Sequence, residues 1–303
     1  MQSIRAVEER ADPWNICRIL GLGAILKTEK TPVSRHSGTG YRKKGIMIRT
    51  LEAFLLHINQ VASTVTSSAT DYPENWFIEP HCHAKHQLIY AIEGVMVVRS
   101  DQGQWTVPPS RGIWMPCGQV HSVRCIGLVK MRSVFVRPDH LPDLPTQTRA
   151  VSISPLLSEL IKTSTGIQAP CEPDSREGRV LRLILDELAI LPTLPLHLPQ
   201  PRDARLKTIC AALQSDPGDS STLAQWSERL SLDEKTIQRL FNKDTGMTFG
   251  QWRQQSRLLL ALERIAVGEK IIDVAGMLGY DSPSAFTTMF KKQFGKTPSH
   301  FFK

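Results

Sequence analysis

The stretch IDVAGMLGYDSPSAFTTMFKKQFG at residues 272–295 decides the fold of the C-terminal third of the chain. It repeats an earlier stretch, AQWSERLSLDEKTIQRLFNKDTG at residues 224–246, and has one more residue in its turn than that stretch. The apolar spacing of each copy predicts a helix, a short turn and a second helix, which is the helix-turn-helix pattern. Asp233 and Ser282-Pro283 stand where the second helices should begin, because short side-chain oxygens cap helices and proline is tolerated at the first helical position.

A third helix is predicted at Thr248–Val267, between the two copies, from its apolar periodicity. It would join the copies rigidly, so that their second helices could enter successive major grooves about 34 Å apart. Gly279 supplies a flexible turn in the second copy. In the first copy Ser231 stands where glycine would be expected.

Several motif residues in this region carry a family resemblance. They are Gln238-Arg239-Leu240-Phe241, Thr245-Gly246, Phe249-x2-Trp252-Arg253, Arg257, Leu278-Gly279-Tyr280-x-Ser282-x-Ser284-x-Phe286-x3-Phe290-Lys291-x2-Phe294-Gly295 and Pro298. Residues 205–303 thereby resemble the AraC/XylS family of transcriptional regulators. The resemblance implies double-stranded DNA as partner, a homodimer, contact with RNA polymerase if the protein is an activator, and a recognition helix in each copy.

By position in the family motif, the resemblance also implies which residues contact DNA. The base-contacting residues would be Lys235, Gln238, Arg239, Ser284, Thr287 and Thr288. The phosphate-contacting residues would be Lys243, Arg253, Arg257, Lys291 and Lys292. Arginine can bind guanine, and glutamine can bind adenine, through two hydrogen bonds each. Thr288 replaces a basic residue that is common in the family, so we expect the second copy to contact mainly the DNA backbone.

The middle of the chain has a different pattern of apolar and turn-forming residues. From about Phe77 to Arg137, short apolar runs alternate with Gly and Pro turns, which predicts an antiparallel barrel or sandwich. Residues 153–163 and 176–191 have helical apolar spacing and resemble the dimerisation region of such regulators. Residues 191–201 hold four prolines, which predicts a stiff extended linker and a domain boundary.

Two further motifs lie in the predicted β region. They are His81-x-His83-x3-Gln87-x6-Gly94 and Gly112-x3-Pro116-x-Gly118-x2-His121. They resemble the two cupin motifs, which implies a metal held by His81, His83 and His121. Gln87 replaces the usual carboxylate and Cys125 the usual Asn, yet three imidazoles can still hold a divalent ion. Residues 81, 83 and 87 share odd parity, so a strand would place them on one face.

The function of this histidine cluster stays open between several hypotheses. The first is a metal-free effector pocket lined by His81, His83, Gln87, Trp105, Arg111, Trp114 and His121. The others are a metal that completes the sensor, a metal-dependent cupin enzyme with an appended DNA-binding domain, and histidines that serve packing alone. A further alternative is an effector-independent regulator whose barrel is only a dimerisation scaffold. The chain lacks the P-loop, Gly-x-Ser-x-Gly and Ser-x-x-Lys motifs, so we expect no enzyme.

The charge distribution agrees with a nucleic-acid partner. The 303 residues carry a net charge of +8. Residues 1–46 hold nine Lys and Arg against four Asp and Glu, and residues 205–303 hold fourteen against ten. Basic segments therefore flank a nearly neutral middle, which favours a polyanionic partner. Six scattered cysteines, with no C-x-x-C pair, predict reduced thiols and a bacterial cytoplasmic location.

These observations predict a multidomain α+β chain. Residues 1–46 would be a poorly ordered basic leader or the product of a misassigned start. A cupin-like antiparallel β-barrel sensor would occupy residues 47–145, and a helical dimerisation region with the Pro-rich linker residues 146–201. An all-α domain with two helix-turn-helix units joined by a long helix would occupy residues 202–303.

Overall fold

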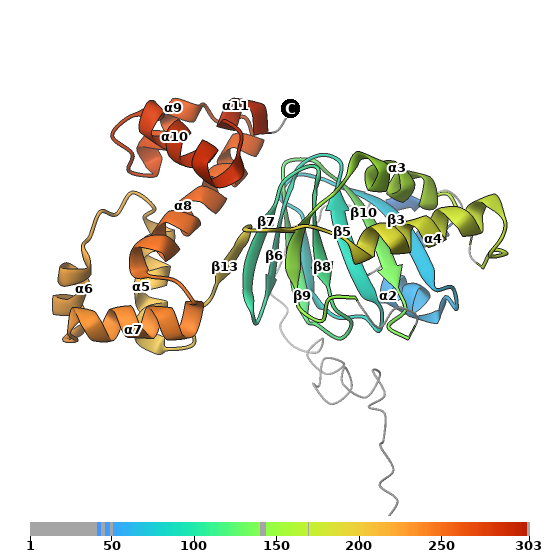
Figure 1. The fold of residues 1–303 in the computed structure, drawn as a ribbon, viewed down its shortest axis with the longest axis horizontal. Coiled ribbons are helices and arrows are strands. Elements are labelled where there is room, and N and C mark those ends of the chain that lie inside the picture. Colours follow the sequence, from blue (N-terminus) through green and yellow to red (C-terminus); the bar gives the residue numbers. More distant parts are fainter. Residues whose placement is uncertain (1–40, 44–45, 49–50, 140–143, 169, 302–303) are drawn as a thin grey trace, which may run out of the picture.

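The computed structural model describes residues 41–43, 46–48, 51–139, 144–168 and 170–301 (Figure 1). Antiparallel sheets form the N-terminal part and helices the C-terminal part, which confirms the predicted fold class. The predicted leader lies outside the described residues, apart from 41–43 and 46. None of the described helices has both the length and the apolar character needed to cross a bilayer.

The strands fall into two large sheets and one small hairpin. The hairpin contains β1 (Tyr41–Lys43) and β2 (Ile46–Ile48). One sheet has the order β12 (Thr193–Leu194), β11 (Arg149–Ser152), β8 (Arg111–Met115), β5 (His86–Ala91), β10 (Val129–Val136) and β3 (Val65–Tyr72). The other has the order β13 (His197–Pro199), β7 (Gly103–Val107), β6 (Val95–Ser100), β9 (His121–Ile126) and β4 (Phe77–His81).

The sheet register decides which side chains face the barrel interior. Gln87 pairs with Met115, and the next residue, Leu88, pairs with Trp114. Because successive strand residues point to opposite faces, Gln87 and Leu88 lie on different sides of the sheet. Leu88 and Trp114 pack in the core cluster that includes Leu157 of α3.

The helices α3 (Pro155–Ser164) and α4 (Arg176–Ala189) cover that outer face (Figure 1). They confirm the helical spacing predicted for residues 153–163 and 176–191. Each begins at a serine cap: the Ser154 hydroxyl accepts from the Leu157 amide at 3.0 Å, and Ser175 does the same for Gly178 at 3.0 Å.

The Pro-rich segment is extended, as predicted, but it is not a free spacer. Leu194 pairs with Ala150 of β11, and His197 pairs with Trp105 of β7. The segment thus supplies an edge strand to each large sheet, the position in a sheet that tolerates proline. The sequence analysis did not predict α2 (Leu51–Gln60) or β3. Strand β3 has the polar sequence VTSSATDY, in which apolar and polar residues do not alternate clearly.

The C-terminal part contains the predicted repeat. Its helices are α5 (Ala204–Ser215), α6 (Leu223–Leu230), α7 (Glu234–Thr245), α8 (Phe249–Ala266), α9 (Ile271–Met277), α10 (Pro283–Phe294) and α11 (Pro298–Phe301). The helix α8 runs between the pairs α6–α7 and α9–α10 and confirms the predicted connecting helix (Figure 1). Ile237, Phe241, Phe286 and Phe290 are fully buried and anchor the second helix of each pair.

The cysteines differ from the prediction at one position. Cys117, Cys125, Cys171 and Cys210 are free thiols. Cys82, by contrast, is disulfide-bonded, which corrects the expectation of reduced thiols throughout the chain.

Candidate DNA-binding helices and histidine cluster

The second helix of the first helix-turn-helix unit is α7. The Asp233 carboxylate caps it by accepting from the Thr236 amide at 2.9 Å, and Gly246 ends it in the left-handed conformation at φ +70°. Ile237 and Phe241 fix one face against the core. Lys235 is therefore held on the exposed opposite face, as the sequence predicts.

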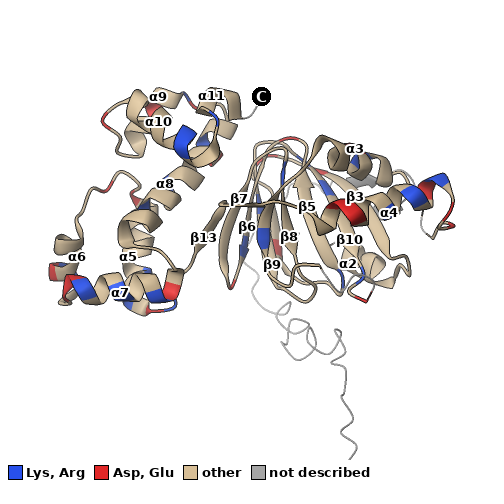
Figure 2. Cartoon of the chain, viewed as in Figure 1, with Lys and Arg blue, Asp and Glu red and all other residues tan. Residues whose placement is uncertain are grey.

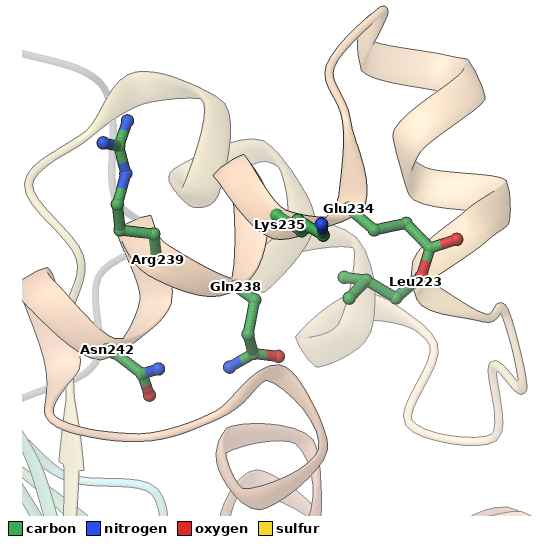
Figure 3. A pocket seen from close by; sticks show the side chains of 6 residues that line it. All are labelled: Leu223, Glu234, Lys235, Gln238, Arg239 and Asn242. Carbon is green, nitrogen blue, oxygen red and sulfur yellow. The ribbon is translucent and has the colours of Figure 1, made fainter.

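A shallow hollow of about 510 Å³ lies along this helix (Figure 3). Its lining residues are Leu223, Glu234, Lys235, Gln238, Arg239 and Asn242. Among the described residues, Gln238 Nε2 is buried without a hydrogen-bond partner. Gln238 and Asn242 project in the same direction in Figure 3. The sequence analysis missed Asn242, although its spacing of four residues after Gln238 could have placed it on that face.

The second helix of the second helix-turn-helix unit is α10. The Ser282 hydroxyl caps it by accepting from the Ala285 amide at 3.2 Å. Ser284 and Thr288 are exposed and Thr287 is half-buried, so all three predicted base-contacting positions reach the surface. They present hydroxyl groups and no charge.

The five predicted phosphate contacts fall into two groups. Lys243, Lys291 and Lys292 are exposed in the last turns of α7 and α10. Figure 2 shows blue Lys and Arg segments on both helices. Arg253 and Arg257 instead turn toward the loop before α6. Arg253 Nη1 donates to Ser221 O at 2.9 Å, and Arg257 Nε donates to Pro217 O at 2.7 Å.

Arg257 makes a second bond to this loop, from Nη2 to Asp219 O at 2.9 Å. Burial lowers the pKa of its guanidinium. Two backbone carbonyls thus accept from two of the five N–H groups of Arg257, and the side chain links the loop to α8. Sequence spacing gives no sign of this, because the partners are carbonyls about forty positions away.

The histidine cluster forms where β4 and β9 pair. His81 pairs with His121 in the strand register, and their ring centroids are 4.4 Å apart. His83 follows β4, with its ring centroid 5.3 Å from that of His121 and 6.2 Å from that of His81. Gln87 on β5 lies 2.7 Å from His83 Nε2 and 3.0 Å from Ser133 Oγ. The structure therefore brings together four of the seven predicted pocket residues.

Burial determines the charge of this cluster. It lowers the pKa of His81 to about 4, and it lowers the pKa values of His83 and His121 as well. Mutual repulsion between the rings adds to the shift of His121. All three imidazoles are therefore neutral near pH 7.

The geometry of the cluster does not favour a bound metal ion. No three His, Cys, Asp or Glu side chains in the described part of the chain have an arrangement that could hold a metal ion. Gln87 already lies at hydrogen-bond distance from His83 Nε2. As arranged, the cluster does not fit the metal that the cupin motifs imply.

Arg111 and Trp114 do not belong to this cluster, which corrects the predicted pocket. Trp114 faces outward, donates from Nε1 to Pro145 O at 2.8 Å and stacks on His86. The Arg111 guanidinium lies 5.7 Å from the ring centroid of Phe301 in α11.

Trp105 differs from these two because it lies within the main buried core. Its ring stacks on His197 with centroids 4.4 Å apart. The sequence also missed Ser133, which holds Gln87, because the pairing register is not readable from the chain.

The barrel and the DNA-binding helices meet along α8. The Arg124 guanidinium of β9 contacts the buried Glu263 carboxylate at 2.7 Å. Trp252 Nε1 donates to Pro199 O at 2.8 Å, and Gln255 Nε2 donates to Pro195 O at 2.7 Å. The helix that joins the two helix-turn-helix units is thus also the helix that contacts the barrel.

Comparison with known proteins agrees with this architecture. Residues 65–238 match the AraC-like ligand binding domain, and residues 226–303 match a helix-turn-helix domain. The HTH-type transcriptional regulator NimR of Escherichia coli K12 is 34% identical over 221 residues, which cover 73% of this chain and 81% of that protein.

Two further relatives match at lower coverage or identity. The regulator RipA of Corynebacterium glutamicum is 35% identical over 122 residues, covering 40% of this chain and 35% of that protein. The activator RhaR of Klebsiella pneumoniae is 21% identical over 279 residues, covering 85% and 96%. With a barrel, two helix-turn-helix units and these matches, the chain belongs to the AraC family of DNA-binding transcriptional regulators.

Proposed function

We propose that this regulator reads bases mainly through α7 and responds to a small molecule bound at the histidine cluster. The observation that carries the first part is the polar face of α7, where Lys235, Gln238 and Arg239 stand opposite the buried Ile237 and Phe241. On this proposal it acts in the bacterial cytoplasm, where its DNA is, and catalyses no reaction.

Each DNA contact has a distinct role in this proposal. Arg239 recognises guanine and Gln238 recognises adenine, while Lys235 adds a third contact. Ser284, Thr287 and Thr288 make weaker contacts from α10. Lys243, Lys291 and Lys292 bind phosphates and fix the register without reading sequence. Arg253 and Arg257 act as positioning residues, since carbonyls of the loop before α6 hold both.

Strand β9 offers a route from the effector to the DNA-binding helices. It carries His121 toward the barrel interior and, three residues later, Arg124 toward Glu263 of α8. Residues of opposite parity point to opposite faces of a strand, so one strand touches both sites. A ligand that shifts β9 would alter the Arg124–Glu263 contact and bias the orientation of α8.

The domain boundaries and the dimer belong to the same proposal. Residues 47–145 form the sensor, 146–201 the dimerisation and connecting region, and 202–303 the DNA-binding domain. On α4, Leu183 is 38% exposed, and Ile190, at the end of the helix, is 73% exposed. The two lie one heptad apart, which suits pairing with a second copy. An activator of this kind would also contact RNA polymerase.

Selection of DNA sites from a random library tests the base-reading role. We expect Arg239→Ala to weaken specific binding by about 1–3 kcal/mol and to relax one base position. Arg99→Ala is the charge-matched control, because Arg99 is an exposed barrel residue bonded to Gln104. An Arg239→Ala protein with unchanged base preference would remove α7 from the proposal.

A further inference from the structure

Asn242 lies exposed on α7, three residues before the helix ends at Thr245, and the proposed function gives it no role. Its side chain makes no hydrogen bond or ion pair within the described part of the chain. The nearby Asp244 differs, because its Oδ2 accepts from the amides of Arg202 and Asp203 at 2.9 and 2.8 Å. The amide of Asn242 is therefore available to a molecule that binds along α7.

The helical repeat places Asn242 in the middle of the polar face of α7. Successive residues of an α-helix are rotated by about 100° around its axis. Asn242 is thus rotated by about 40° from Gln238 and by about 60°, in the opposite direction, from Arg239. All three side chains line the hollow along this helix, and those of Gln238 and Asn242 project in the same direction (Figure 3). Asn242 therefore lies between two residues that are proposed to read bases.

The residue after it, Lys243, has a different orientation and a different chemistry. It is rotated by about 100° from Asn242, and it does not line the hollow. A lysine gains affinity for DNA by releasing counterions from phosphates, whereas a neutral amide releases none. An amide at the centre of this face is therefore suited to base selection more than to electrostatic affinity.

The amide of Asn242 matches the major-groove edge of adenine. Adenine presents N7 as an acceptor and its N6 amino group as a donor. Asn242 Nδ2 can donate to N7 while Oδ1 accepts from N6, so one side chain makes two hydrogen bonds to one base. Guanine presents two acceptors at this edge, so the amide oxygen would face another acceptor. Adenine is therefore the base that satisfies both ends of the amide.

The spacing along α7 limits where that adenine lies. Residues four positions apart in an α-helix are separated by about 6 Å along its axis. The bases of each DNA strand are about 3.4 Å apart. If α7 lies along the groove, the base contacted by Asn242 is at most about two base pairs from the base contacted by Gln238.

We propose that Asn242 is a further specificity-determining residue, which recognises an adenine within about two base pairs of the base contacted by Gln238. The inference rests on the proposed function of α7 as the helix that reads bases. It adds one residue and one base to that function.

Selection of DNA sites from a random library by the full chain tests this role. Asn242→Ala should remove the adenine preference at one position and weaken binding to the preferred site by about 5–150-fold. The salt dependence of binding should stay as in the wild type, because no charge is lost. Gln214→Ala is the matched control, since Gln214 is an exposed amide on α5 that does not line the hollow.

Two results with Asn242→Ala would overturn the proposal. One is a base preference identical to that of the wild type. The other is an equal loss of affinity for all sequences, which would make Asn242 a phosphate contact. Far-ultraviolet circular dichroism and an unchanged urea midpoint establish that the variant is folded, as expected for an exposed side chain without internal hydrogen bonds.

An exchange of base preference gives a sharper test than a loss. Asn242→Asp keeps the shape of the side chain and replaces its NH2 group by an oxygen. A carboxylate only accepts hydrogen bonds, so the preference at the same position should move from adenine toward cytosine, whose N4 amino group donates. A purely structural role would not change the preferred base. An Asn242→Asp protein that still selects adenine there would overturn the proposal.

Arg239→Ala in the same selection separates this inference from the proposed function. If Arg239→Ala relaxes one base position and Asn242→Ala relaxes none, α7 reads bases without Asn242, and only this inference fails. If neither variant changes the base preference, α7 is not the reading helix, and the proposed function fails with it. If the two variants relax two different positions, both stand.

Discussion

The two helix-turn-helix units share their helix caps and their buried packing, but they differ in their outer surfaces. Asp233 caps α7 and Ser282 caps α10, each through a short side-chain oxygen. Gly246 and Gly295 end these helices in the left-handed conformation, at φ +70° and +75°. Buried apolar side chains hold both helices against α8 and its neighbours. Caps and core thus fix where a recognition helix lies, independently of what it reads.

The outward positions are where the units diverge. The first unit presents Lys235, Gln238 and Arg239, which combine charge with amide and guanidinium donors. The second presents Ser284 and Thr288, and hydroxyl groups discriminate little between bases. On the proposed function, we therefore expect the first unit to supply most of the sequence preference and the second to supply affinity and register.

The turns differ as well, and packing explains why. Ser231 and Gly279 both have positive φ, at +52° and +72°. A Cβ on Gly279 would lie 2.8 Å from Gly218 O and 3.3 Å from Arg257 Nη2. Ser231 accommodates its side chain, so only the second turn requires glycine.

Gly279→Ala should give the largest effect of the changes considered. Left-handed strain and the clash with Gly218 O each cost about 1–2 kcal/mol, so we expect a loss of about 3 kcal/mol in the free energy of unfolding. Ser231→Gly should instead raise stability by up to about 1 kcal/mol. Urea unfolding followed by circular dichroism measures both. Equal effects at the two turns would refute the packing explanation.

Local features of the sequence predicted the helices of the repeat well. Features that depend on long-range contacts, such as the face on which a strand residue lies, could not be predicted. Caps, glycine ends and apolar spacing are set by neighbouring residues, so α7, α8 and α10 were found near their observed bounds. The histidines were found because a motif spaces them. Trp114 was a candidate pocket residue and is instead buried in the core on the other face of the sheet, because the face of a strand residue is known only once the register is known.

Arg257 shows the same limit in the DNA-binding part. Its position in the family motif suggested a phosphate contact, but the folded chain places two loop carbonyls around it. A guanidinium on a long, flexible side chain can reach water or a distant loop, and the sequence does not distinguish these outcomes. Tertiary packing therefore decides the role of such a residue.

The lysines of α10 test whether the second helix-turn-helix unit contacts mainly the DNA backbone. Lys291→Gln/Lys292→Gln should reduce the slope of log binding constant against log salt by about 2, because each lysine releases about one counterion from DNA. Base preference in a site selection should stay as in the wild type. A changed preference would mean that the second unit reads sequence, and the proposed division between the units would fail.

The smallest expected effects concern the first helices of the two units. Thr222 and Gln225 form a capping box on α6, with the Thr222 amide donating to Gln225 Oε1 at 2.8 Å. Lys270 stands at the same place before α9, and its side chain makes no cap hydrogen bond. Thr222→Ala should therefore lower the free energy of unfolding by about 1 kcal/mol, whereas Lys270→Ser should raise it by about 0.5–1 kcal/mol. The serine hydroxyl would add the missing acceptor, and the substitution would remove a positive charge from a helix N-terminus. A loss of stability in Lys270→Ser, measured by urea unfolding, would therefore show that the two units do not follow the same capping rule.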